Sequence, residues 1–257
     1  MKKSANIKDN LSAASLIIVI LIIWQIVTQT GLVGPFLLPK PLDVVKAFIY
    51  DMPTISSHLL TTLSEAFLGL FLGVLLGFIA ALMMDFSDGI YHALYPILVL
   101  TQTVPTVAIA PLLVLWMGYG ILPKIVLIVI VTFFPVAISL LEGFKQVDVD
   151  KIKLLKAMGA DKFKIYRYIK LPESMGNFFS AFKIAVSYSV VGAVIAEWLG
   201  GFKGLGVYMI RVQKNYSFDK MFAVIFLISG ISLILMKLVS ILQKKMMPWI
   251  KEEKWKI

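Results

Sequence analysis

Histidine, acidic and nucleophilic side chains would carry any chemistry, and in this sequence they form no catalytic pattern. The two histidines, His58 and His92, lie in no H-E-x-x-H or comparable metal-binding spacing. The chain has no cysteine, which excludes disulfides, zinc–thiolate sites and cysteine nucleophiles. Neither a G-x-S-x-G elbow nor a G-x-x-x-x-G-K-[ST] loop occurs. We therefore expect no catalytic residue, no metal and no cofactor bound by this chain.

Two features near residue 200 need an interpretation. The segment GGFKGLG (200–206) is glycine-rich, but it follows an apolar stretch rather than a strand, so we interpret it as a flexible turn at a membrane surface and not as a dinucleotide site. Glu197, beside Trp198, is the acidic residue of note near the end of that stretch. We prefer a structural partnership with a basic or backbone group, and a place on a solute path is the alternative.

The composition indicates a membrane protein. Of the 257 residues 59% are hydrophobic, and the mean hydropathy is +0.89. A soluble domain, which is usually about half apolar, cannot bury that much apolar surface in one core. The net charge of +10 is therefore assigned to loops beside anionic lipid, and no nucleic-acid partner is expected.

Charge-free windows predict an all-α integral membrane protein with about six transmembrane helices in one domain, residues 11–243. The first apolar run is too long for a signal-peptide core, so we expect an uncleaved span. Pro96, Pro105 and Pro111 predict that the third span is kinked. The predicted spans are 11–30, 59–84, 89–117, 121–142, 176–199 and 219–243.

Basic residues predict the orientation. The N-terminus (1–10), the loop 143–175 and the tail 244–257 are lysine-rich, and six spans place all three on one side, the cytoplasm. The segment 201–220 is also basic although it falls outside, and we follow the three agreeing segments. Gly69, Gly73 and Gly77 form a smooth ridge on the second span; packing within one subunit and a dimer seam both remain open.

The loop between the fourth and fifth spans contains LLKAMGADKFKIYRYIKLP (154–172), which is basic and helix-forming. Gly159 is expected to adopt the positive φ that ends a first short helix, and Asp161 to cap a second. Apolar residues recur at helical spacing in each: Val149, Ile152 and Leu155, then Phe163, Tyr166 and Ile169. The pattern suits a projecting elbow that binds a partner, and equally an amphipathic helix lying on lipid.

This stretch resembles the cytoplasmic EAA loop of ABC-importer permeases. Gly159 stands at the glycine of that pattern and Leu171–Pro172 at its closing pair, whereas Lys153, Leu154 and Leu155 replace Glu-Ala-Ala. Further segments resemble permeases of the nitrate/sulfonate/taurine type: FLLPKPLDVVKAF (36–48), TVPTVAIAPLLVLWMGYG (103–120) and KIAVSYSVVGAVIAEWLGGFKGLGVYM (183–209). The segment 183–209 most resembles permeases for thiamine-pyrimidine precursors in its sequence.

The resemblance implies a type I importer permease in a bacterial plasma membrane, with both termini cytoplasmic and no catalysis of its own. It implies a second permease copy as a homodimer, a separate cytoplasmic ABC ATPase that holds ATP and Mg, and an extracellular solute-binding protein. The transported solute would be an anion such as a sulfonate or nitrate, or a small heterocycle. The residues that the resemblance assigns to ATPase coupling are Lys153, Leu155, Lys156, Ala157, Met158, Gly159, Ala160, Asp161, Leu171 and Pro172.

A solute path needs polar groups inside spans, because such groups are costly against lipid. The candidates are Gln102, Thr103, Ser187, Tyr188, Ser189 and Glu197. Two other classes of membrane protein are alternatives. An ion-coupled secondary transporter would explain the proline-broken span, but no span carries a mid-helix Asp, Glu or Arg. An intramembrane enzyme would need facing nucleophile, base or metal ligands, which the sequence does not provide.

Overall fold

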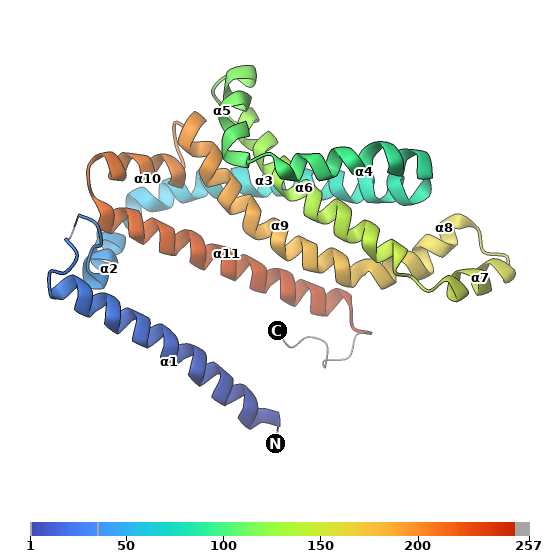
Figure 1. Ribbon diagram of the computed structural model, residues 1–257, viewed down its shortest axis with the longest axis horizontal. Helices are drawn as coiled ribbons and strands as arrows, with labels where there is room; N and C mark the ends of the chain where they lie inside the picture. The colour runs from blue at the N-terminus through green and yellow to red at the C-terminus, as the bar shows by residue number, and fades with distance from the viewer. Residues whose placement is uncertain (1, 35, 250–257) are drawn as a thin grey trace. The chain divides into compact units, whose positions relative to one another are not determined.

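The computed structural model describes residues 2–34 and 36–249, with side chains from Ser15 onward. Every regular element in this part is helical (Figure 1). Contacts divide the chain into two compact units, residues 1–58 with 208–227 and residues 59–207 with 228–257. The principal helices are α1 (Lys2–Gln29), α2 (Pro41–Tyr50), α3 (Met52–Phe86), α4 (Asp88–Thr103), α5 (Thr106–Met117), α6 (Leu122–Lys145), α7 (Val149–Ala157), α8 (Lys162–Ile165), α9 (Leu171–Gly200), α10 (Leu205–Lys214) and α11 (Phe218–Met246).

Four helical stretches in the described residues are long and apolar enough to cross a bilayer: α3, α6, the run Lys162–Gly200 that contains α9, and α11. The predicted spans 59–84, 176–199 and 219–243 lie inside them, and 121–142 does so except for Ile121, which caps α6. Of α1, the part with described side chains, Ser15–Gln29, is an apolar helix. The total of six spans therefore stays a prediction, and the end of the tail, residues 250–257, lies outside the described residues.

The predicted third span is broken rather than gently kinked. The axes of α4 and α5 meet at 103°, so the pair counts as one span only if it is a broken one (Figure 1). Val104 has ψ 121° and Pro105 caps α5, which fits the rule that a residue before proline avoids helical ψ. Pro96 and Pro111 lie inside α4 and α5 and leave each helix continuous. Of the three prolines, Pro105 therefore marks the break.

The glycine ridge of α3 packs against α6 within one chain. A Cβ added to Gly69 would lie 2.5 Å from Cβ of Ile128, and one on Gly73 would lie 2.0 Å from Oγ1 of Thr132. One on Gly77 would lie 2.8 Å from the Phe133 carbonyl oxygen. Of the two hypotheses for this ridge, packing within the subunit is the one that the contacts support.

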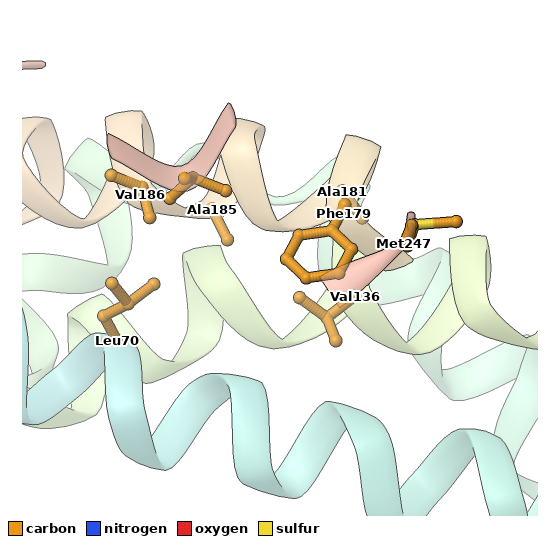
Figure 2. Close-up of a cluster of buried hydrophobic side chains, with 8 residues drawn as sticks. Leu70, Val136, Phe179, Ala181, Ala185, Val186 and Met247 are labelled. Atoms are coloured by element: carbon orange, nitrogen blue, oxygen red, sulfur yellow. The ribbon is translucent and has the colours of Figure 1, made fainter. Parts of the chain in front are cut away.

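The core of the larger unit lies where α9 packs on α6 and α3. Phe179 of α9 is buried among Leu70, Val136 and Met247, as Figure 2 shows. Small residues such as Ala185 on the same face let the helices approach closely. The opposite face of α9 is exposed at Ser180, Ile184, Tyr188 and Val191. One face of α9 thus packs in the core of the larger unit, and the other face is exposed.

Candidate functional site

The loop between α6 and α9 folds as two short helices joined at a glycine, here called the α7–α8 elbow (residues 148–170), at the ends of α6 and α9 (Figure 1). The Asp148 carboxylate caps α7 by accepting a hydrogen bond from the backbone N–H of Asp150 at 2.8 Å. Asp161 caps α8 in the same way, accepting from the Lys164 N–H at 2.9 Å. The predicted cap at Asp161 is confirmed, and these caps offset the weakness of such short helices.

Gly159 ends α7 in the left-handed region, with φ +82°, as predicted. Its N–H donates to the Lys156 carbonyl at 3.0 Å, and the next N–H, of Ala160, donates to the Leu155 carbonyl at 3.0 Å. This pair of hydrogen bonds is a Schellman motif, which holds the chain at a defined angle as it leaves the helix. The direction of α8 relative to α7 therefore depends on the backbone at Gly159.

The predicted apolar stripes are only partly correct. Ile169 is buried and Ile152 and Leu155 are half-buried, but Val149 and Phe163 are exposed. The outward surface of α7 instead carries Leu154, 62% exposed, and Met158, 76% exposed. No residue of α7 is fully buried. The remaining coupling candidates on the elbow, Lys153, Lys156, Ala157 and Asp161, are exposed with them, and Ala160 is half-buried.

Ion pairs fasten the elbow to the membrane-spanning helices. Asp85, at the end of α3, accepts hydrogen bonds from Tyr166 and, at 2.6 Å, from Lys170. On the exposed side Lys151 lies 2.6 Å from Glu173, and this hydrogen bond raises the pKa of the lysine. Leu171 and Pro172 form the start of α9, so the elbow continues directly into that helix. A displacement of the elbow would therefore be transmitted to α3 and α9.

A cavity of about 190 Å³ lies at the break between α4 and α5 and is here called the α4–α5 cavity. All its lining residues are uncharged; aliphatic side chains of α6 and α9 form most of the wall. Its polar groups come from Thr101, Gln102, Thr106 and Tyr188. Discontinuous helices often frame solute sites in transporters, because they place polar backbone and side chains at membrane depth.

The predicted path residues divide between this cavity and the protein interior. Gln102 and Tyr188 line the cavity. Thr103 is exposed and donates to the Leu100 carbonyl, and Ser187 is half-exposed on the same side of α9 as Tyr188. Ser189 is buried and bonded to the Val186 carbonyl, so it is placed for helix packing. The structure thus gathers two of the six candidates at one cavity.

Glu197 lies in a buried polar network rather than on the cavity wall. It accepts hydrogen bonds from the Thr62 hydroxyl at 2.7 Å and from the Gly206 N–H at 2.6 Å. Thr62 also accepts the Leu205 N–H at 2.8 Å. The start of α10 is therefore fixed by two side chains, which agrees with the structural partnership preferred for Glu197.

Two charged members of this network were missed. Glu65 lies inside α3 and forms an ion pair with Lys124 at 2.5 Å. Both are buried, at 3% and 4% exposure. Both fall near the ends of the predicted spans 59–84 and 121–142, so the expectation that no span carries a mid-helix acidic residue drew no attention to them as a pair. Carboxylates this deep could have been recognised because they require a cation nearby.

The glycines of the 200–206 segment serve close packing. A Cβ on Gly204 would lie 2.1 Å from Cδ of Glu197, and one on Gly206 would lie 2.3 Å from the Val194 carbonyl oxygen. Gly204 also has φ +135°. The segment is a tightly packed turn over a carboxylate: the expected turn is present, but it is not the flexible one that we expected, because its glycines make room for Glu197.

In the smaller unit the Asp51 carboxylate binds two polar side chains. It accepts hydrogen bonds from Tyr208 at 2.6 Å and pairs with Lys220 at 2.8 Å. Burial raises the pKa of Asp51, but the bonds to Lys220 and Tyr208 outweigh it and leave the pKa below its ordinary value. His58 is buried beside the Tyr208 ring. In the described residues no cluster of His, Asp and Glu could hold a metal ion.

Apolar spans, a broken helix beside an uncharged cavity, and an exposed elbow define a membrane permease. The fold is similar to a solved structure of the MetNI methionine ABC transporter in an inward-facing conformation, with a TM-score of 0.63 over 78% of this chain and 97% of that chain at 19% identity. The formylaminopyrimidine transport permease protein ThiX of Halalkalibacterium halodurans is 32% identical over 92% of this chain and 94% of its own. The putative aliphatic sulfonates transport permease protein SsuC of Bacillus subtilis is 31% identical over 90% of this chain and 84% of its own.

The family model for the binding-protein-dependent transport system inner membrane component matches residues 73–248. The chain belongs to this family, the inner-membrane permeases of ABC importers. The resemblance in the 103–120 and 183–209 segments is thereby confirmed, and membership of this family decides against the secondary transporter.

Proposed function

We propose that this permease is driven by a separate ABC ATPase, which binds ATP and Mg and docks on the α7–α8 elbow. The exposed apolar surface of Leu154 and Met158 carries this proposal. Exposed lysines of α7 surround this apolar surface, and no residue of α7 is buried within the chain. An apolar patch with a basic rim is what a helix needs in order to bind a groove of another protein.

The elbow is also suited to transmit movement. Its Schellman turn fixes the angle between α7 and α8, and the Asp85 pairs and the direct junction with α9 connect it to two spans. Closure of an ATPase pair would shift the elbow and, through it, the helices that frame the α4–α5 cavity. This chain then needs no nucleotide site of its own.

The solute belongs, in this proposal, to one of the two chemical classes named for the relatives: a small pyrimidine, as for ThiX, or an aliphatic sulfonate, as for SsuC. The uncharged wall of the α4–α5 cavity would suit the organic part of either. An extracellular binding protein would deliver the solute. A second copy of this chain would complete the path, with both termini in the cytoplasm.

Purification of the tagged full-length chain in mild detergent tests the proposal. An ATPase should co-purify, and the sample should hydrolyse MgATP. Leu154→Glu should reduce the co-purified ATPase about tenfold at unchanged abundance of the chain, because it places a carboxylate in the contact. Tyr216→Glu, at a residue 71% exposed in the turn before α11, is the matched control and should have no effect. Retention of the ATPase by Leu154→Glu would contradict docking at the elbow.

A further inference from the structure

A basic pocket lies between the α7–α8 elbow and the end of α3 and is here called the elbow–α3 pocket. Its volume is about 270 Å³. Among the described residues that line it, four are charged: Lys156 of α7, Lys162 of α8, Lys170 and Asp85 of α3. These four side chains carry a net charge of +2. The pocket is distinct from the α4–α5 cavity, whose lining is uncharged.

The negative charge of the pocket is already engaged. The Asp85 carboxylate accepts hydrogen bonds from Tyr166 and, at 2.6 Å, from Lys170. In the part of the chain that the structure describes, neither Lys156 nor Lys162 forms an ion pair, and both side chains are exposed. Two ammonium groups of the pocket are therefore available to an anion from solution or from the membrane.

The edge of the pocket is apolar and continues along α3, which is long and apolar enough to cross a bilayer. Phe86 lines the pocket and is 61% exposed, and Nζ of Lys162 lies 4.5 Å from the centroid of its ring. At about 100° per residue, one stripe of exposed apolar side chains extends from Phe86 along the helix. Its members are Met83, Ile79, Leu75 and Leu68. An exposed apolar stripe on a bilayer-spanning helix is a surface for acyl chains.

The pocket lies on the side of α7 opposite the surface that we propose for the ATPase. Ile152 and Lys156, four residues apart, line the pocket, whereas Leu154 and Met158 form the outward surface. At about 100° per residue the two pairs point in directions about 160° apart. A ligand in the pocket is therefore compatible with an ATPase docked on the elbow.

We propose that the elbow–α3 pocket binds the headgroup of an anionic phospholipid, with Lys156 and Lys162 donating hydrogen bonds to its phosphate oxygens. Basic pockets between membrane-spanning helices are suited to anionic headgroups. The headgroup connects α7 and α8 to the end of α3, and an acyl chain lies along the α3 stripe. A free phosphate ion offers the same oxygens but no acyl chain, so the stripe favours the lipid. This inference goes beyond the proposed function and requires neither an ATPase nor a solute.

Lipid binding to the purified full-length chain in detergent tests the proposal. Native mass spectrometry would measure the affinity for dioleoylphosphatidylglycerol, with zwitterionic dioleoylphosphatidylcholine as the reference lipid. The double variant Lys156→Gln, Lys162→Gln should weaken binding of phosphatidylglycerol about tenfold or more and leave binding of phosphatidylcholine unchanged, because each lysine near a headgroup attracts its negative charge. Both side chains are exposed, so the variant should fold as the parent does, which its melting temperature checks.

The matched control removes two charges from the same elbow outside the pocket. Lys164→Gln with Arg167→Gln, both at exposed residues, should change the affinity for phosphatidylglycerol less than about twofold. Lys156→Arg with Lys162→Arg should retain binding, since it keeps both charges. An equal loss in the two glutamine double variants would overturn the pocket and indicate diffuse attraction to a basic loop. Displacement of phosphatidylglycerol by an equal concentration of inorganic phosphate would overturn the lipid as the occupant. Neither result bears on the proposed function, because the assay contains no ATPase.

Discussion

The backbone at Gly159 is where a single substitution tests the coupling role most directly. Gly159 has φ +82°, and an added Cβ would meet no atom within 4 Å. A side chain there therefore causes no clash, and its cost is the backbone strain alone, about 1–2 kcal/mol and more when the side chain is β-branched. A shift of that size lowers the ratio of native to non-native elbow about 5- to 30-fold. We expect Gly159→Val to weaken ATPase binding and solute uptake by up to this factor.

A graded series separates backbone strain from other effects. Asparagine tolerates the left-handed region better than alanine, and valine tolerates it least, so binding should follow Gly159, then Gly159→Asn, Gly159→Ala and Gly159→Val. ATPase affinity is measured on the purified permease, and membrane abundance serves as the control, because the spans do not depend on this turn. Equal binding across the series would refute the reasoning and would leave the elbow as a helix that lies on lipid.

Three further substitutions test the packing and the charges. Gly73→Ala should destabilise the protein by about 1–3 kcal/mol in detergent melts, because its Cβ would overlap α6, whereas Gly230→Ala on α11, with open space around it, should not. Lys124→Met should cost about 3–5 kcal/mol by leaving Glu65 buried and unpaired, and adding Glu65→Leu should restore most of it; a melt without that recovery would contradict the pairing. Asp51→Asn should lower the melting temperature at neutral pH by about 1–3 °C. Since the folded pKa of Asp51 is lowered, its stabilisation is present above the ordinary carboxyl pKa, and the deficit should vanish as the pH falls through the lowered value.

The features predicted correctly from the sequence are those with local causes. The positive φ of Gly159 and the cap at Asp161 depend on a few neighbouring residues, and the apolar windows depend on composition. The direction of the elbow stripes was less predictable, because the second stripe does not lie on one α-helix. Phe163 belongs to α8, whereas Ile169 belongs to a π-helical turn, residues 166–170, whose longer period breaks the spacing; Ile169 is buried and Phe163 is exposed.

The site features that were missed depend on contacts between distant segments. Glu65 and Lys124 are 59 residues apart, and Thr62 and Glu197 are 135 apart. In the sequence each charged residue stands apart from its partner, and a single charge beside an apolar stretch resembles the end of a span. The break at Pro105 was visible as a proline, but its 103° angle follows from how α5 packs on α6 and α9. The cavity at that break was therefore beyond prediction from spacing.

The Glu65–Lys124 pair bears on how the protein is made. During synthesis α3 leaves the ribosome before α6. Glu65 therefore reaches the insertion machinery 59 residues before Lys124, the lysine with which it pairs. An unpaired charge in a membrane-spanning helix disfavours insertion, by about 3 kcal/mol at the helix centre and by less near its end, where Glu65 pairs with the third residue of α6. The strongly apolar remainder of α3 would carry the helix into the bilayer, and α3 would remain incompletely settled until α6 emerged. We therefore expect α3 to be held in the bilayer less firmly in a chain truncated before Lys124 than in the full-length chain, which extraction of the membranes with alkaline carbonate would measure.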